Sequence, residues 1–144
     1  MFSVNAYAQS YIDGCRSKVK LHLATYKNLA ITARSQYPVQ PNLSNALESF
    51  EPVFFNNMVL VIDKYFNHRN RDIELTDGNP LNEVRLLSNS MISNNNKFTP
   101  DNNIQYLPEK SVLKYKAGDE IKLSEADFTK LYKAYFEEIE NKYL

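Results

Sequence analysis

The sequence is poor in the residues from which most enzyme and metal sites are built. Its 144 residues include one cysteine, two histidines, three glycines and no tryptophan. The lone Cys15 excludes an internal disulfide and leaves no cysteine cluster that could hold structural zinc. The glycines at positions 14, 78 and 118 lie far apart, so the chain has no glycine-rich phosphate loop. We therefore expect neither a metal nor a cofactor.

A surplus of charge of one sign and a long apolar run are also missing. Lysine and arginine number 17, aspartate and glutamate number 17, and the formal net charge is zero. No global field therefore draws the chain to nucleic acid or to anionic lipid. No apolar run approaches the roughly 20 residues of a membrane span, and no signal-peptide pattern opens the chain. We expect a single cytoplasmic domain over residues 1–144 that does not contact a membrane.

Apolar periodicity runs through most of the chain and predicts a mainly α domain, bundle-like and built from four helices. The first helix is expected over residues 3–34, where apolar residues recur at helical spacing. Its apolar face comprises Val4, Ala8, Tyr11, Cys15, Val19, His22, Tyr26, Leu29 and Ala33. The other helices are expected over 45–69, 80–93 and 124–143.

Start signals support the last two of these helices. Asn79 is a good N-cap, and Pro80 suits the first helical position, where a missing N–H costs nothing. Ser124 and Asp127, three residues apart, form a capping box. Both helices therefore have defined first turns.

The second helix is expected to begin near Asn45, with Glu48 completing a capping box, and Pro52 then kinks it or marks its first turn. Beyond Pro52, two adjacent apolar stripes make an unusually broad face. They consist of Phe54, Met58, Val61 and Tyr65, and of Phe55, Val59, Ile62 and Phe66. A face this broad predicts a homo-oligomer, most simply a homodimer, that associates through this helix. The run MVLVI (58–62) could alternatively be a buried strand.

Two short alternating runs, LKY (113–115) and IKL (121–123), are separated by the turn-like segment KAGDE. This pattern predicts a small β-hairpin over about 112–123, directly before the last helix. An isolated hairpin is barely stable, so we expect it to dock on the helices.

The densest group of candidate binding residues lies between positions 65 and 85, which hold three of the five arginines and one of the two histidines. On a structural interpretation, cations end the second helix, one acid and one amide cap the third, and Glu83 pairs with a nearby arginine such as Arg85. On a functional interpretation, the helix ends converge to bind an anion or the acidic surface of a protein partner. The candidates are His68, Arg69, Arg71, Asp77, Asn79, Glu83 and Arg85.

A second candidate group lies on the first helix. Arg16, Lys20, Lys27 and Arg34 fall within a narrow sector beside the apolar face, at about 100° per residue. They could form a basic stripe about 27 Å long that follows a nucleic-acid backbone. Alternatively, they are a solvated flank that pairs with acidic residues of the last helix, such as Glu140. The neutral total charge favours the second interpretation.

Cys15 and His22 share the apolar face of the first helix but lie two turns apart, about 10 Å by helix rise. That separation is too large for a nucleophile and its base. We therefore expect Cys15 to be a small buried hydrophobe and His22 to be a buried histidine with its hydrogen bonds satisfied.

The segment RSKVKLH (16–22) places Arg16 and His22 with five residues between them. It resembles the Arg-to-His signature of HEPN-type ribonucleases, which are dimeric helical bundles. The resemblance implies that the two side chains meet across a dimer to act on RNA. Here Ser17 follows the arginine, where the family usually has Asn, Asp or His.

Four further segments resemble those of uncharacterised bacterial proteins of similar size. They are DGNPLNEVR (77–85), SVL (111–113), GDEI (118–121) and EADF (125–128), and the resemblance spans roughly residues 50–140. It implies a bacterial, cytosolic protein and brings no activity, fold or cofactor with it.

Together these features predict a binding or interaction protein without catalysis of its own, a helical bundle that self-associates through its second helix. Two alternatives stay open. One is an RNA-cleaving dimer that uses Arg16 and His22, and the other is a nucleic-acid binder that uses the basic stripe.

Overall fold

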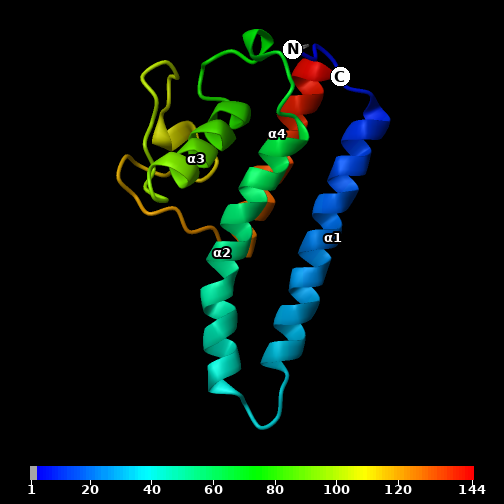
Figure 1. Ribbon diagram of the computed structural model, residues 1–144, viewed down its shortest axis with the longest axis vertical. Coiled ribbons are helices and arrows are strands. Elements are labelled where there is room, and N and C mark those ends of the chain that lie inside the picture. The colour runs from blue at the N-terminus through cyan, green and yellow to red at the C-terminus, as the bar shows by residue number, and fades with distance from the viewer. Residues whose placement is uncertain (1–2) are drawn as a thin grey trace.

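Figure 1 shows the computed structural model, which describes residues 3–144. Within them lie four α-helices, which confirms a mainly α, bundle-like fold. None of the helices in this range is long and apolar enough to cross a membrane. The helices are α1 (Gln9–Arg34), α2 (Pro41–Tyr65), α3 (Pro80–Ser93) and α4 (Glu125–Tyr143), and two short 3-10 helices are η1 (Arg71–Ile73) and η2 (Pro108–Lys110).

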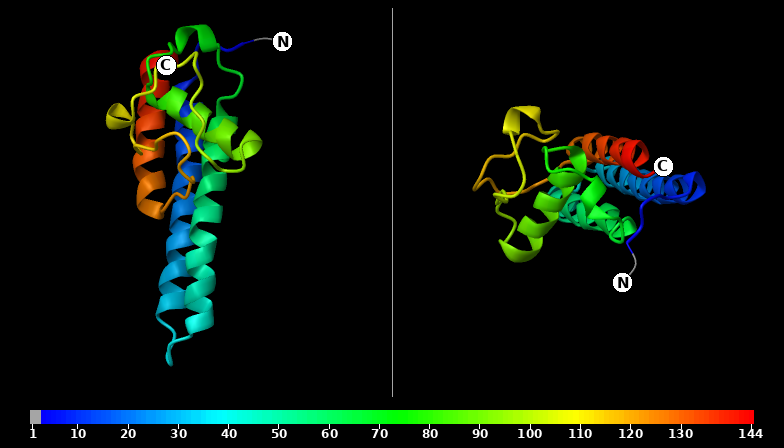
Figure 2. Two further views of the ribbon diagram at one scale, coloured as in Figure 1. Left: turned by 90° about the vertical axis from the view of Figure 1, so that its left-hand side faces the viewer. Right: turned by 90° about the horizontal axis from the view of Figure 1, so that it is seen from above.

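The helices α1 and α2 form a long antiparallel hairpin, and α4 packs along only part of it (Figures 1 and 2). The helix α3 lies against α2 and α4. The first residue of α4, Glu125, is level with Lys27 of α1 and Glu51 of α2, because it contacts both. Residues 28–50 therefore project beyond α4. We call this projection the arm, and the rest of the molecule the body.

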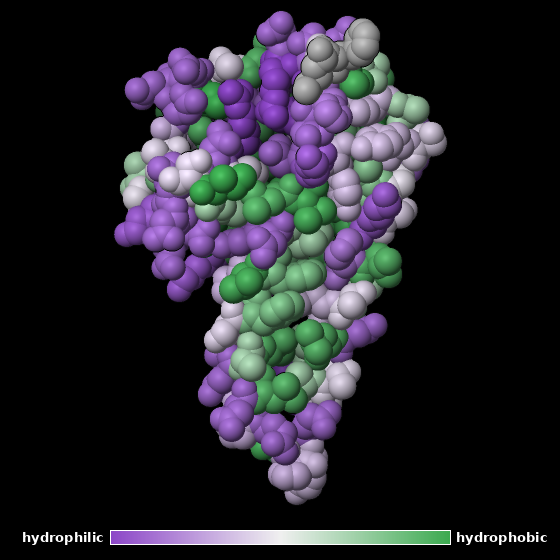
Figure 3. All heavy atoms as spheres, in the orientation of Figure 1, coloured by the Kyte–Doolittle hydropathy of each residue, from purple (hydrophilic) through white to green (hydrophobic). Residues whose placement is uncertain are grey.

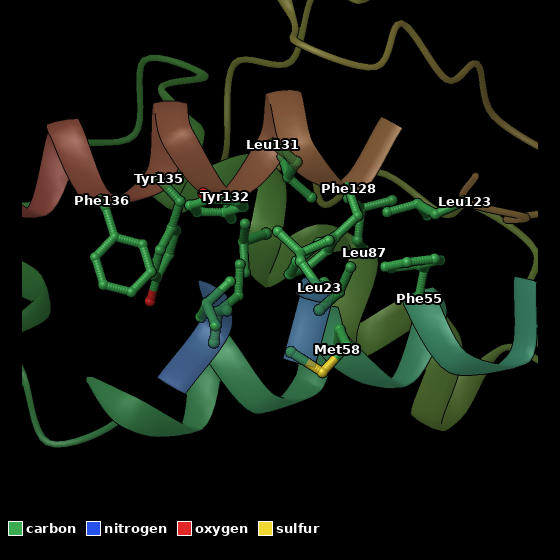
Figure 4. Packing of buried hydrophobic residues seen from close by; sticks show 14 of the residues in the cluster. Leu23, Phe55, Met58, Leu87, Leu123, Phe128, Leu131, Tyr132, Tyr135 and Phe136 are labelled. Atoms are coloured by element: carbon green, nitrogen blue, oxygen red, sulfur yellow. The ribbon is translucent and has the colours of Figure 1, made fainter. Parts of the chain in front are cut away.

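The hydrophobic core fills the body, where all four helices contribute (Figure 4). Leu23 of α1 and Phe55 of α2 point towards α4, which contributes Phe128 and Leu131, and Leu87 joins them from α3. Phe55, Leu87 and Leu131 are each 0% exposed. Full burial of such a side chain stabilises the fold by about 1.5–3 kcal/mol, so α4 contributes strongly to the stability of the body.

The helix α2 begins at Pro41, not near Asn45 as predicted. Proline lacks an N–H, which the first helical turn does not need, so Pro41 occupies the first helical position. Asn45 and Glu48 consequently lie inside the helix and form no capping box. Pro52 also lies inside α2, and MVLVI (58–62) is helix rather than strand.

The two predicted stripes of α2 have different surroundings. The stripe made of Phe55, Val59, Ile62 and Phe66 is 0% exposed throughout. The other stripe is only partly covered, because Met58 is buried whereas Phe54, Val61 and Tyr65 are half-buried.

The first helix begins at Gln9, not at residue 3 as predicted. The residues before it are extended, because their backbone groups bind distant partners. Val4 N donates to His68 O (2.7 Å) and Val4 O accepts from Asn70 N (2.7 Å), while Tyr7 N donates to Tyr143 O (2.6 Å). This segment ties the start of the chain to the end of α4.

The predicted β-hairpin over 112–123 does not form. Lys114 has a φ of 62°, a left-handed conformation that interrupts the first predicted strand. The segment around Gly118 instead approaches residues 96–98, where Phe98 N donates to Asp119 O (2.8 Å) and Ile121 N donates to Asn96 O (2.7 Å). Lys97 and Glu120 form a single antiparallel bridge rather than a sheet.

The predicted starts of α3 and α4 are confirmed. Asn79 caps α3 by accepting hydrogen bonds from the backbone N–H groups of Leu81 (2.9 Å) and Asn82 (3.2 Å), and Pro80 is the first helical residue. Ser124 and Asp127 form the capping box of α4.

Candidate interaction surfaces

The predicted binding region around residues 68–85 is mainly a buried polar network that fastens the chain after α2. Because α2 ends at Tyr65, His68, Arg69 and Arg71 follow the helix instead of ending it. Arg69 is only 2% exposed and its Nε donates to Glu74 Oε2 at 3.1 Å. Its guanidinium also donates to Phe66 O (3.1 Å).

Glu74, which is 1% exposed, is the residue of this network that the sequence did not reveal. Its carboxylate also accepts from Asn82 Nδ2 (3.2 Å), so it joins η1 to α3. On the other side, Arg69 donates to Tyr135 Oη of α4 (3.4 Å). Burial raises the pKa of Tyr135 far above its usual range, so the phenol stays protonated. The network therefore links the chain after α2 to both α3 and α4.

Glu83 is 2% exposed and does not pair with Arg85 as expected. Its two carboxylate oxygens accept hydrogen bonds from the backbone N–H groups of Val112 (2.8 Å) and Leu113 (2.9 Å). Burial raises the pKa of Glu83, and the two N–H donors oppose that shift. The carboxylate therefore holds the loop between α3 and α4 against the body.

The remaining predicted binding residues are dispersed. Asp77 accepts a hydrogen bond from Asn79 Nδ2 (2.8 Å) beside the start of α3. Arg71 lies 3.7 Å from Glu74, His68 is exposed, and Arg85 is half-buried. The seven candidates thus do not converge on one open site, and their role in binding stays a prediction.

The basic residues of α1 are partly neutralised. Arg16 Nη2 donates to Glu140 Oε1 at 2.6 Å, which is the pairing with the last helix that we expected. Arg16 also contacts Asp13 (3.1 Å), and Lys27 lies 3.5 Å from Glu125. Within residues 3–144, Lys20 and Arg34 form no ion pair. The four cations are therefore not an uninterrupted free stripe.

The expectation for Cys15 and His22 is half right. Cys15 is buried, at 3% exposure. His22 is exposed, and its ring Nδ1 lies 2.6 Å from Lys18 O. The helix turns His22 away from the core because the buried positions are Val19, Leu23 and Tyr26. The proposed RNA-cleaving pair of Arg16 and His22 thus combines an ion-paired arginine with an exposed histidine, and cleavage stays a prediction.

The most apolar open surface lies on the arm. A groove of about 270 Å³ runs between α1 and α2, and no charged residue lines it. Figure 3 shows the hydrophobic band that covers this part of the molecule. We call it the arm groove, and its lining is Leu29, Ala33, Leu43, Ala46, Leu47 and Phe50.

A larger cavity of about 520 Å³ lies at the other end of α2, in the body. Val61 and Tyr65 line it together with Lys64, and Ile92 of α3, 72% exposed, closes one side. A third cavity of about 270 Å³ shares Leu60 with it and also borders α2. Open apolar surface therefore lies near both ends of α2, and the cavity between them has a more polar lining.

No protein-family model, curated protein or solved structure matches the chain. Residues 3–144 contain no group of three or more His, Cys, Asp or Glu side chains that could hold a metal ion. The function must therefore be argued from the surfaces themselves.

Proposed function

We propose that this protein is a non-catalytic interaction protein that self-associates through the open face of α2, with the arm groove at the centre of the interface. The observation that supports this proposal most is the uncovered apolar surface of the arm. Leu29 is 49% exposed, Leu43 40% and Phe50 41%, although all three line one groove. Apolar surface gathered in this way marks interaction sites more often than scattered exposed residues do.

The open face extends beyond the arm. At about 100° per residue, Leu43, Phe50, Phe54, Val61 and Tyr65 fall within a sector of about 60° on α2. A standard protein interface uses about 20–30 residues on each side, so the six residues of the arm groove would not suffice alone. The partly covered stripe and the cavity beside Tyr65 supply the rest of the contact surface.

A second copy of the chain suits this face because the interface of a two-fold dimer must be complementary to itself. A surface with charges of one sign would repel the same surface on a second copy. The lining of the arm groove contains no charged residue, so this repulsion does not arise. Interface centres are depleted of charge in the same way. The zero net charge of the chain adds no long-range repulsion between two copies.

The direct test is the mass in solution, measured by light scattering for the wild type and two variants. Leu43→Glu places a charge in the groove and should turn the dimer into a monomer. The matched control is Ile31→Glu, because Ile31 is 65% exposed on the same arm but does not line the groove. It should leave the dimer intact. A monomeric wild type, or equal effects of the two substitutions, would contradict the proposal.

A further inference from the structure

A recess between α1 and α4, away from the arm groove, has a different chemical character. Its volume is about 250 Å³, and three lysines border it. Lys20 and Lys27 come from α1, whereas Lys133 comes from α4. We call it the lysine recess, and its full lining is Lys20, Leu23, Ala24, Lys27, Thr129, Tyr132 and Lys133.

The lining contains no carboxylate. Lys27 Nζ lies 3.5 Å from Glu125 Oε2 and forms an ion pair with it. Lys20 and Lys133 form no ion pair with any residue in the range 3–144. Three ammonium groups around one recess repel one another, and an anion between them would relieve that repulsion. Lys20 and Lys133 can therefore bind a ligand without breaking an ion pair.

The floor of the recess strengthens such an interaction. Leu23 is 8% exposed and Tyr132 is 4% exposed, so the base of the recess belongs to the hydrophobic core. Charges interact more strongly next to a low-dielectric wall than in open water. Thr129 Oγ1 donates its proton to Glu125 O at 2.8 Å, so this hydroxyl is not free to donate to a ligand.

We propose that the lysine recess binds the phosphate group of a small ligand, either inorganic phosphate or a phosphate monoester. Lys20 and Lys133 donate to the phosphate oxygens, and Lys27 adds its charge while it remains beside Glu125. A phosphate dianion fits better than a carboxylate because it offers more acceptor oxygens and twice the charge to several ammonium donors.

The site suits one phosphate group better than the backbone of a nucleic acid. A strand needs a continuous series of cations. Along α1 the series stops at Arg16, because Glu140 (2.6 Å) and Asp13 (3.1 Å) neutralise its guanidinium. The recess therefore has enough cations for a single phosphate, and no row of unpaired cations continues from it along α1 through Arg16.

The test is isothermal titration calorimetry, in which inorganic phosphate is added to the whole 144-residue chain in an otherwise phosphate-free buffer at constant ionic strength. We expect saturable binding that Lys133→Gln weakens by about tenfold or more, the effect of losing one charge-assisted hydrogen bond. Lys130→Gln is the matched control, because Lys130 is an exposed lysine of α4 outside the recess. It should leave the affinity unchanged.

Two further titrants identify the source of the phosphate. Tighter binding of ribose 5-phosphate than of inorganic phosphate would assign the site to a monoester, and the reverse would assign it to the free ion. Absence of saturable binding, or equal effects of the two lysine substitutions, would overturn the proposal. So would an eight-nucleotide RNA that binds more tightly than either and whose affinity falls steeply with salt.

Discussion

The body and the arm share the two long helices α1 and α2, but α3 and α4 pack on these helices only in the body. In the body, Leu131 and Phe55 are 0% exposed, whereas Leu43 and Phe50 in the arm are 40% and 41% exposed. One cause is the length of α4, which is too short to pack along the whole of α1 and α2. The 26 residues of α1 extend about 39 Å, whereas the 19 residues of α4 extend about 28 Å.

This difference shows that an amphipathic helix does not determine by itself what covers it. Both halves of α2 carry apolar residues at helical spacing, but the covering helix α4 begins beside Glu51 and does not reach the residues of α2 before it. The surface left over lies in the same sector of α2 as the partly covered stripe of Phe54, Val61 and Tyr65. A surface of this origin is suited to a further helix, and a second copy can supply one.

The largest expected effect concerns the buried ion pair that fastens the body. Arg69→Ala removes the buried cation that binds Glu74 and leaves only the more distant Arg71, at 3.7 Å, so it should lower the free energy of unfolding by about 3–5 kcal/mol. The control Arg71→Ala removes a more exposed cation that also lies near Glu74 and should cost less than about 1 kcal/mol. Chemical denaturation measures both. Equal costs would show that Arg69 does not hold the body together.

The next prediction compares matched leucines in the two regions. Leu131→Ala should lower the free energy of unfolding by about 2–5 kcal/mol, because the side chain is fully buried. Leu43→Ala should cost less than about 1 kcal/mol when measured at low protein concentration, where the arm has no partner. Denaturation at a high concentration should reveal an additional cost for Leu43→Ala. A large cost at low concentration would mean that the chain itself covers the arm.

A smaller effect is expected from pH, and it should come from the body alone. Burial raises the pKa of Glu83 above its usual 4.5. Between 4.5 and the raised value, the folded chain holds a proton that the unfolded chain has released, so stability falls as the pH rises through this window. Glu83→Gln should abolish this part of the pH dependence in denaturation curves. An unchanged dependence would assign it to other groups.

The smallest effect is expected at the exposed edge of α4. Hydrogen bonds from Gln9 and then Arg16 lower the pKa of Glu140. Its contribution to stability is present above the unfolded pKa and is lost as the pH falls through the lower, folded value. In carboxyl NMR titrations, Gln9→Ala should therefore raise the pKa of Glu140 towards its usual range. No change after this substitution would show that the contact does not persist in solution.

Local signals in the sequence predicted the starts of α3 and α4 correctly. The caps at Asn79 and Ser124 depend on neighbours within three residues, and both were confirmed. The β-hairpin was wrong because its outcome depends on distant groups. Glu83 binds the backbone at Val112 and Leu113, and Lys114 turns left-handed beside them. No local pattern reports a carboxylate that lies about thirty positions earlier in the chain.

The candidate surfaces were predictable to different degrees. The broad face of α2 was visible in its two stripes, and the arm also left a sign in its composition. Residues 28–50 contain only two charged residues, Arg34 and Glu48. The lysine recess was visible only in part, because Lys20 and Lys27 belong to the predicted basic stripe whereas Lys133 joins them only after α4 packs on α1.

The most direct measurement is hydrogen–deuterium exchange of the arm at increasing protein concentration. If a second copy covers the open face of α2, amides in residues 28–50 should exchange more slowly as the concentration rises. Amides around Leu131 in the body should not change. Exchange in the arm that stays equally fast at every concentration would contradict the account.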